Sequence, residues 1–206
     1  MMIAIIISAP SGAGKTTLIE KLIIQNPIYE FAISTTTRPI RSNEKEGKDY
    51  YYVSYDEFMK MVDNNEFVEW AKVHDNYYGT TKKEIDRINA NSKIPIFDVD
   101  VQGARALRNK LQKVVSIFII PPSIKELEKR LRHRSTETQQ QIKIRLTNAV
   151  SELREYINYD YIVVNDDLQK ALEDLGAILK AIILRREFKE KAVKNLLEGV
   201  HDYTIR

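Results

Sequence analysis

The sequence predicts an α/β fold in which a parallel β-sheet carries α-helices on both of its faces. Short apolar runs typical of buried parallel strands alternate with amphipathic stretches typical of helices. A glycine-bearing turn joins the first apolar run to the first amphipathic stretch. Acidic, amide or hydroxyl side chains follow three of the apolar runs, and the carboxyl ends of parallel strands form the edge where ligands bind.

Composition narrows the class of protein. A chain of 206 residues can form one domain with a sizeable core, and 43% hydrophobic with 30% charged residues is ordinary for a soluble globular protein. A net charge of +3 is too small to indicate nucleic-acid binding, and the lack of cysteine excludes disulfides and thiolate metal sites. No apolar run is long enough for a membrane span, and the apolar start at 1–7 leads directly into the glycine-bearing turn. We expect a cytoplasmic monomer or homodimer that binds neither nucleic acid nor membranes.

The turn at Ser8 to Thr17 has the features of a phosphate-binding loop between a strand and a helix. Gly12 and Gly14 permit close backbone approach, and N–H groups at the helix start attract an anion. Lys15 can reach the outer phosphates of a nucleotide, and the Thr16 hydroxyl can ligate Mg²⁺. An ordinary turn with a solvated lysine is the alternative, which this strand–turn–helix context disfavours. The sequence therefore predicts a nucleoside-triphosphate site.

Residues 32–83 are expected to form a small β-rich region inserted into the α/β pattern. Within it, Ser54 and Glu57 form a capping box at the start of a short helix, with Phe58 on its buried stripe. The other elements expected here are a β-branched segment at 34–37, a charged loop at 38–48, strands at 50–53 and 67–73, and a turn at Asp75-Asn76.

The alternation of strands and helices resumes at Lys82. Ser123 and Glu126 form a second capping box at a helix start. The expected elements are strands at 94–99, 114–120 and 161–164, helices from 82, 102 and 123, a helix around 142–153, and a final helix at 168–183 with an exposed, mixed-charge extension beyond Arg185.

Two groups of side chains in the inserted region suit a second ligand. Arg38 and Arg41, with Tyr50 and Tyr78, form a good receptor for a phosphate monoester, although a solvated basic turn explains the arginines equally well. Carboxylates can accept hydrogen bonds from a base with paired N–H donors, which suits guanine, and hydroxyls can meet its O6 or N7. The candidates for this role are Glu69 and Asp100 as acceptors, and Ser34 and Thr80 as hydroxyls. Taken alone, Glu69 is more often a surface glutamate.

Asp98 and Asp100 follow a predicted strand and alternate onto one face of it. Carboxylates at such positions hold magnesium, directly or through water, in phosphoryl-transfer sites. Asp100 is equally credible as the cap of the next helix. Arg130 and Arg134 lie four residues apart on one predicted helix and Arg145 on the next, so they could close over a triphosphate, with an ordinary basic helix surface as the alternative.

With these pieces in place, the chain resembles the guanylate kinase family over almost its full length. The matching motifs are the phosphate loop, Thr36-Thr37-Arg38 with Arg41, Glu44, Gly47 and Tyr50, then Tyr77-Tyr78-Gly79-Thr80, Asp98 to Gly103, Arg130 with Arg134 and Arg145, and Val164 to Asp167. The resemblance implies a P-loop NTPase fold and magnesium-assisted transfer of the γ-phosphoryl group of ATP to GMP and dGMP. It also implies a core (1–31, 84–124 and 155–206), a GMP-binding region (32–83) and a helical lid (125–154).

The resemblance assigns roles residue by residue. Its catalytic residues are Lys15, Arg41, Arg134 and Arg145. Its ATP-binding residues are Ser11, Gly12, Ala13, Gly14, Lys15, Thr16, Thr17, Arg130, Arg134 and Asn165, the last of these at adenine. Its GMP-binding residues are Ser34, Arg38, Arg41, Glu44, Tyr50, Glu69, Tyr78, Thr80 and Asp100, with Glu44 supporting the neighbourhood of Arg41. Magnesium would be held by Thr16, Asp98 and Asp100, partly through water.

The chain departs from the family pattern at three positions, none of which removes a charged group. Ala9 replaces the strict glycine of the loop, Ile40 stands where a proline is usual with Pro39 before it, and Ser135 replaces a glycine after the lid arginine. Two other functions fit parts of the pattern. A kinase for a phosphorylated sugar would share the loop, but Glu69 favours a purine, and a non-catalytic phosphopeptide scaffold would tend to lose the loop that is intact here.

Overall fold

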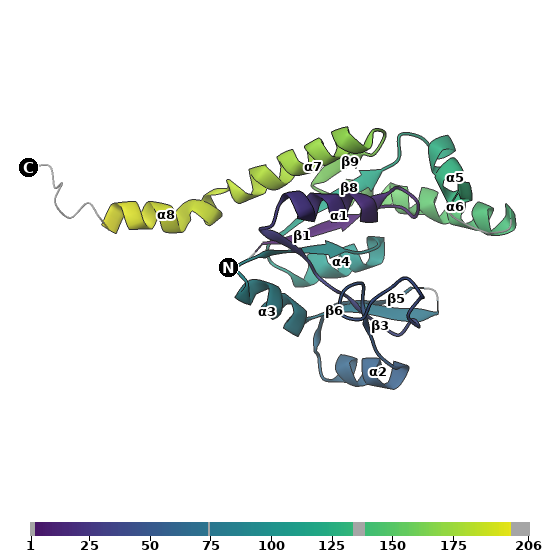
Figure 1. Ribbon diagram of the computed structural model, residues 1–206, viewed down its shortest axis with the longest axis horizontal. Helices are drawn as coiled ribbons and strands as arrows, with labels where there is room; N and C mark the ends of the chain where they lie inside the picture. The colour runs from purple at the N-terminus through teal and green to yellow at the C-terminus, as the bar shows by residue number, and fades with distance from the viewer. Residues whose placement is uncertain (1–2, 74, 134–138, 199–206) are drawn as a thin grey trace, which may run out of the picture.

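The computed structural model describes residues 3–73, 75–133 and 139–198, which form two β-sheets with helices around them (Figure 1). The larger sheet has five parallel strands in the order β2-β7-β1-β8-β9. Its strands are β1 (Ala4–Ser8), β2 (Tyr29–Phe31), β7 (Ile94–Asp98), β8 (Val114–Ile120) and β9 (Tyr161–Val164). The predicted parallel α/β fold is confirmed.

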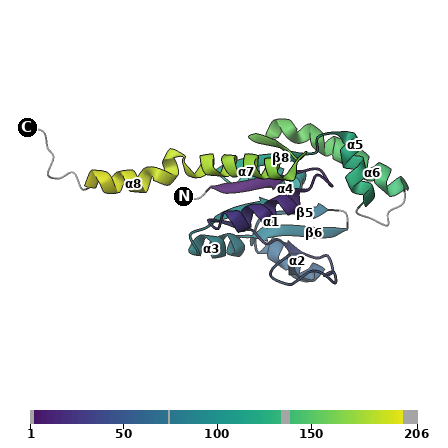
Figure 2. The same cartoon turned by 45° about the horizontal axis from the view of Figure 1, so that its top comes forward.

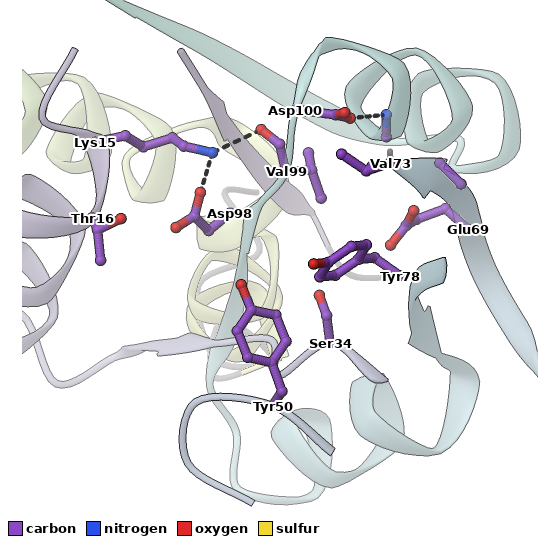
Figure 3. Close-up of a pocket in the computed structure, with 12 residues that line it drawn as sticks. Lys15, Thr16, Ser34, Tyr50, Glu69, Val73, Tyr78, Asp98, Val99 and Asp100 are labelled. Atoms are coloured by element: carbon purple, nitrogen blue, oxygen red, sulfur yellow. Dashed lines mark hydrogen bonds and ion pairs between the residues drawn. The ribbon is translucent and has the colours of Figure 1, made fainter. Parts of the chain in front are cut away.

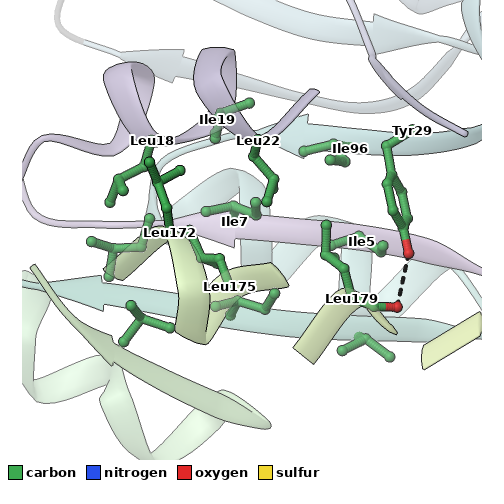
Figure 4. Close-up of a cluster of buried hydrophobic side chains, with 14 of the residues drawn as sticks. Ile5, Ile7, Leu18, Ile19, Leu22, Tyr29, Ile96, Leu172, Leu175 and Leu179 are labelled. Carbon is green, nitrogen blue, oxygen red and sulfur yellow. Dashed lines mark hydrogen bonds between the residues drawn. The ribbon is translucent and has the colours of Figure 1, made fainter. Parts of the chain in front are cut away.

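Helices cover both faces of this sheet. The apolar side chains of β1 alternate between the two faces, so each face needs a covering layer. Ile5 and Ile7 point into a core made with α1 (Lys15–Gln25) and α7 (Leu168–Ile183), which Figure 4 shows. Ile6 points the other way, into a core made with α3 (Lys82–Ala90) and α4 (Val101–Lys110). The central strand is therefore apolar throughout, as expected of a parallel strand buried on both faces.

Strand β2 was not among the elements predicted from the sequence. It has three residues, too few to show a period, and it pairs with β7 through Tyr29, Glu30 and Phe31. Tyr29 is buried, and its hydroxyl donates a hydrogen bond of 2.8 Å to the carbonyl oxygen of Leu179 on α7 (Figure 4). Burial of this phenol raises the pKa of Tyr29 to about 12.

The smaller sheet lies beside the larger one and has the order β4-β3-β6-β5. Its strands are β3 (Thr35–Thr36), β4 (Tyr51–Tyr52), β5 (Phe67–Val73) and β6 (Asn76–Thr81), and helix α2 (Tyr55–Asp63) packs near them. Ser54 and Glu57 form the predicted capping box at the start of α2. The turn expected at Asp75-Asn76 is shorter than predicted, because Asn76 already pairs with Val73 as the first residue of β6.

Two further helices, α5 (Ile124–His133) and α6 (Gln139–Leu153), pack together through Leu127, Leu131 and Ala149, and a 3₁₀ helix at Arg154–Asn158 follows them. The Ser123 hydroxyl accepts the Glu126 N–H at the start of α5, as the second predicted capping box requires. The Glu126 carboxylate bonds to Arg130 instead of returning to the cap, because a nearby guanidinium is the stronger donor. Arg134 and Ser135, predicted for the lid, lie outside the described residues.

The last helix, α8 (Arg186–Glu198), extends α7 away from the body of the molecule in both views (Figures 1 and 2). None of its residues is buried, as expected for the mixed-charge extension. Among the helices of the described segments, none is both long and apolar enough to cross a bilayer.

Leu175 and Leu196 provide a matched test of where the core lies, since Leu175 is 0% exposed on α7 and Leu196 is 73% exposed on α8. Leu175→Ala should lower the free energy of unfolding by about 2–5 kcal/mol, because it leaves a cavity between α7 and the sheet. Leu196→Ala should change it by no more than about 0.5 kcal/mol. Urea unfolding followed by circular dichroism measures both, and comparable losses in the two variants would contradict this description of the core.

Candidate functional site

The loop between β1 and α1 is shaped by two glycines in the left-handed region. Gly12 has φ of 92° and Gly14 has φ of 89°. A Cβ atom on Gly14 would lie 2.5 Å from Nδ2 of Asn165, and one on Gly12 would lie 2.9 Å from a methyl group of Leu131. The loop is thus pressed against β9 and α5, and its backbone N–H groups at the start of α1 can face an anion.

Asn165 and Arg130 hold this loop from behind. The buried carboxamide of Asn165 donates to the carbonyl oxygen of Ala13 at 2.7 Å. Arg130 donates to the carbonyl oxygens of Ala13, at 3.4 Å, and of Asn165, at 3.0 Å. Both side chains therefore hold the loop through the carbonyl oxygen of Ala13, without occupying its N–H groups.

Lys15 reaches across from α1 to the end of β7, as Figure 3 shows. Its ammonium group forms an ion pair with Asp98 and donates to the carbonyl oxygen of Val99 at 2.9 Å. The sequence predicted that Lys15 and Asp98 belong to one site, and parallel pairing of β1 with β7 brings them together. The sequence did not predict the contact with the Val99 carbonyl oxygen, because every residue has a backbone carbonyl and the residue type therefore gives no sign of it.

A central cavity of about 310 Å³ lies between the two sheets (Figure 3). It joins the phosphate-binding loop to the inserted region. Its lining residues are Lys15, Thr16, Ser34, Tyr50, Glu69, Ala71, Val73, Tyr78, Asp98, Val99, Asp100 and Gly103. Eight of these were predicted as site residues from the sequence, so residues far apart in the chain do meet around one space.

Glu69 is the buried acid of the central cavity, at 3% exposure. Its Oε1 accepts two hydrogen bonds from Thr80, from the backbone N–H at 2.9 Å and from the hydroxyl at 2.8 Å. Oε2 accepts no hydrogen bond from the residues that the structure describes. Burial raises the pKa of Glu69 to about 7, against the opposing effect of the Thr80 hydrogen bonds. Glu69 is therefore no surface glutamate.

The aromatic wall of the central cavity carries a guanidinium group behind it. Tyr50 and Tyr78 meet edge to face with their centroids 5.9 Å apart, and Arg38 lies over the Tyr50 ring at 5.3 Å. Arg38 donates to Glu44 at 2.6 Å, and this bond, with a smaller effect of Tyr78, raises the pKa of Arg38. The same bond, helped by the Arg41 N–H and the Tyr52 hydroxyl, lowers the pKa of Glu44 to about 2. This ion pair is a polar support directly beside the cavity.

Glu44 was expected to support the neighbourhood of Arg41, and in the structure it has further partners as well. The Glu44 side chain pairs with Arg38 and accepts the Tyr52 hydroxyl at 2.8 Å, whereas it receives only the backbone N–H of Arg41, at 2.9 Å. Arg41 itself is exposed and is not part of the lining of the central cavity. The Arg38–Glu44 contact is a single charged hydrogen bond, from Nη2 to Oε1, while Nη1 of Arg38 donates to the carbonyl oxygen of Pro39 at 2.8 Å.

Asp100 performs the capping role that was the alternative to metal binding. Its Oδ1 accepts the Gly103 N–H at 2.8 Å at the start of α4, and Figure 3 shows this bond pointing away from Lys15. Asp98 and Asp100 thus face different partners, although both line the central cavity. The described residues contain no cluster of three or more acidic, histidine or cysteine side chains suited to a metal ion. A magnesium ion needs few protein ligands when phosphates and water supply the others, so Thr16 and Asp98 fit it.

A flanking cavity of about 370 Å³ lies on the other side of the loop. Its lining residues are Gly12, Gly14, Thr17, Glu126, Lys129, Arg130, Asn165, Asp166 and Leu168. The predicted residues Arg130 and Asn165 are here, whereas Asp166 and Leu168 were not singled out as site residues. A base could lie in this cavity with its phosphates on the loop.

Helix α6 touches the loop directly. Arg145 donates to the Ser11 hydroxyl at 2.7 Å, and the Ser11 N–H donates to Glu152 at 3.2 Å. Arg145 is therefore placed beside the predicted phosphate site, while Arg134 lies outside the described residues. Glu152 was missed, because an acidic residue on an amphipathic helix is ordinarily a solvated one.

Comparisons with known proteins agree on one family. A profile described as guanylate kinase matches residues 1–182. A guanylate kinase of Myxococcus xanthus is 45% identical over 184 residues, covering 89% of this chain and 88% of that protein. A guanylate kinase of Nitratidesulfovibrio vulgaris is 43% identical over 200 residues and covers 97% of both chains.

A solved structure gives the same result. The crystal structure of guanylate kinase from Anaplasma phagocytophilum superposes with a TM-score of 0.71 at 31% identity, covering 91% of this chain and 94% of that one. The similarity therefore extends over most of both chains.

The buried acid Glu69 should make stability depend on pH. The pKa of Glu69 is about 7 in the folded protein, whereas the ordinary pKa of a glutamate is 4.5, so the folded state binds the proton more tightly than the unfolded state. The stabilisation is complete below about pH 4.5 and is lost as pH rises through 7, by about 3 kcal/mol in total. Urea unfolding at several pH values should show this decline in the native protein, and Glu69→Gln should lack it. Parallel pH profiles in the two proteins would contradict the assignment.

Proposed function

Because the chain belongs to the guanylate kinase family, we propose that its flanking and central cavities hold the two nucleotides of that family's reaction. The chain is a kinase, and its activity is the ATP-dependent phosphorylation of GMP to GDP. One observation carries the assignment of the two sites. Lys15 and Thr16 of the phosphate loop line the same cavity as Glu69 and Tyr78, so donor phosphates and acceptor would meet there.

We assign ATP to the phosphate loop and the flanking cavity. Loop N–H groups and Lys15 would bind its phosphates, and the adenine would lie near Arg130 and Asn165. Contact with Asn165 would involve the part of the residue that lines the flanking cavity, since its amide nitrogen is already bonded to Ala13. The residues proposed for ATP are Ser11, Gly12, Ala13, Gly14, Lys15, Thr16, Thr17, Arg130, Arg134 and Asn165.

We assign GMP to the central cavity. Guanine presents two adjacent N–H donors, and an ionised Glu69 with its available Oε2 is a matching acceptor. Ser34, Thr80 and Asp100 would complete the base site, and Arg38, Arg41, Tyr50 and Tyr78 would hold the phosphate, with Glu44 behind Arg38. Arg41 would have to turn inward for this. None of these residues is assigned to the ribose 2′-hydroxyl, so dGMP should also react.

In the proposed reaction, a phosphate oxygen of GMP attacks the γ-phosphorus of ATP. A new P–O bond forms as the bond to the β,γ-bridging oxygen breaks, and ADP leaves with that electron pair. The attacking oxygen is already ionised, so no protein base is needed. Lys15, Arg134, Arg145 and Arg41 would neutralise the transferring phosphoryl group. Magnesium would be held by Thr16, Asp98 and Asp100, partly through water, and would supply positive charge to the phosphates.

We also propose that the chain works as three parts, a core, a GMP-binding region at 32–83 and a lid at 125–154. Closure of the two mobile parts over both nucleotides would exclude water that would otherwise hydrolyse ATP. The bond from Arg145 to Ser11 supports a lid that reaches the loop. A cytoplasmic location would give the enzyme access to ATP and GMP.

An ADP-release assay across acceptors tests the proposed function. GMP and dGMP should give turnover at least about a hundredfold above AMP, UMP, CMP, dTMP and ribose bisphosphate, because a buried polar group such as Glu69 is left unpaired by the wrong base. Turnover with GMP no higher than with AMP would refute the assignment, and preference for ribose bisphosphate would favour the sugar-phosphate alternative.

Lys15→Met tests the charge at the donor phosphates. It should lower kcat by about a hundredfold to a thousandfold, since it removes a cation that stabilises charge in the transition state. Lys21→Met is the matched control, because Lys21 is an exposed lysine on the same helix, and its kcat should stay within about twofold. Unchanged kcat in Lys15→Met would exclude the assigned role.

A further inference from the structure

Glu84 is a buried carboxylate that lies outside both cavities. It is 2% exposed in the first turn of α3, and it lines neither the central nor the flanking cavity. Helix α3, which carries Glu84, packs against β7 of the larger sheet and β6 of the smaller one, and it lies where the two sheets meet (Figure 1). A buried charge is costly unless it is fully hydrogen-bonded, and a carboxylate kept at this boundary requires partners there.

Both oxygens of Glu84 are hydrogen-bonded. Oε1 accepts the backbone N–H of Ile33 at 2.9 Å and Oε2 accepts the Tyr51 hydroxyl at 3.3 Å. Arg87 supplies a bidentate contact, donating to both oxygens at 2.9 Å. The carboxylate therefore has four donors from three separate segments of the chain.

Two of these segments, those of Ile33 and Tyr51, continue directly into the wall of the central cavity. Ile33 precedes Ser34, and Tyr51 follows Tyr50. The Glu84 N–H donates to the hydroxyl of Thr81, at 3.1 Å, and the residue before it, Thr80, makes the two bonds that orient Glu69. The Tyr51 N–H also donates to the Ser34 carbonyl oxygen at 2.9 Å, which ties two of the segments together.

We propose that Glu84 is a positioning residue for the acceptor nucleotide, one that fixes the spacing of Ser34 and Tyr50 in the wall of the central cavity and of Thr80, which orients Glu69 there. It does so from α3 of the core, so it sets how the inserted region sits on the larger sheet. The inference rests on the proposed assignment of GMP to this cavity. Since no contact of Glu84 reaches the flanking cavity, its effect should be specific to the acceptor.

Glu84→Gln tests this, because it keeps the shape of the side chain but leaves Arg87 without a charged partner at this position. The KM for GMP should rise about tenfold, the KM for ATP should stay within about twofold, and kcat should stay within about threefold. Steady-state kinetics is measured well below the thermal unfolding temperature of each protein. Isothermal titration with GMP alone should show the same tenfold loss of affinity.

Glu30→Gln is the matched control. Glu30 belongs to the same ion-pair network, bonded to Arg87 at 2.5 Å and Lys93 at 2.9 Å, but its partners are not neighbours of cavity residues. Its KM for GMP should stay within about twofold. An equal rise in both variants, or an equal rise in both KM values for Glu84→Gln, would mean general loosening and would overturn the proposal.

Tyr51→Phe decides the matter if Glu84→Gln does not fold, since it removes one hydroxyl and leaves the carboxylate in place. It should raise the KM for GMP about threefold with the KM for ATP unchanged, and an unchanged KM for GMP would overturn the proposal. The native protein, measured alongside, separates the two questions. Failure of the native protein to use GMP would reject the proposed function, whereas normal native turnover with unaffected variants would reject only the role of Glu84.

Discussion

The parallel pairing of β1 with both β7 and β8 is the constraint on which the site depends. Because all three strands run the same way, the segments that follow them emerge at one edge of the sheet. The phosphate loop follows β1, and Asp98 ends the neighbouring strand, so the Lys15–Asp98 ion pair results directly from strand order. β9 lies one strand further and delivers Asn165 to the back of the same loop.

The inserted region depends on a different balance, between buried charges and their partners. Burial disfavours the ionised form of Glu69, with Thr80 opposing it only in part, whereas Glu44 is stabilised as a carboxylate by Arg38. The two acids lie in one small sheet region, yet burial sets the pKa of one near 7 and an ion pair sets the other near 2. Such contrasts between neighbouring acids are typical of a binding site rather than of a surface.

Residue patterns predicted the larger part of this arrangement. The alternation of apolar runs gave the parallel sheet, and the strand–turn–helix context gave the phosphate loop. The capping box at Ser54 located α2 because both of its members act locally. What was not predicted depends on distant or backbone contacts. β2 is too short to show a period, the partner of Lys15 is a main-chain carbonyl at Val99, and Glu84 looks in sequence like any glutamate near a helix start.

Helix α8 has a practical consequence. It projects from the end of α7, has no fully buried side chain, and lies far from α5 and α6 in both views (Figures 1 and 2). Its exposed positions therefore suit covalent attachment to a fluorophore or a solid support. A protein tethered there would leave both cavities facing solution, so nucleotide binding could be followed on an immobilised sample.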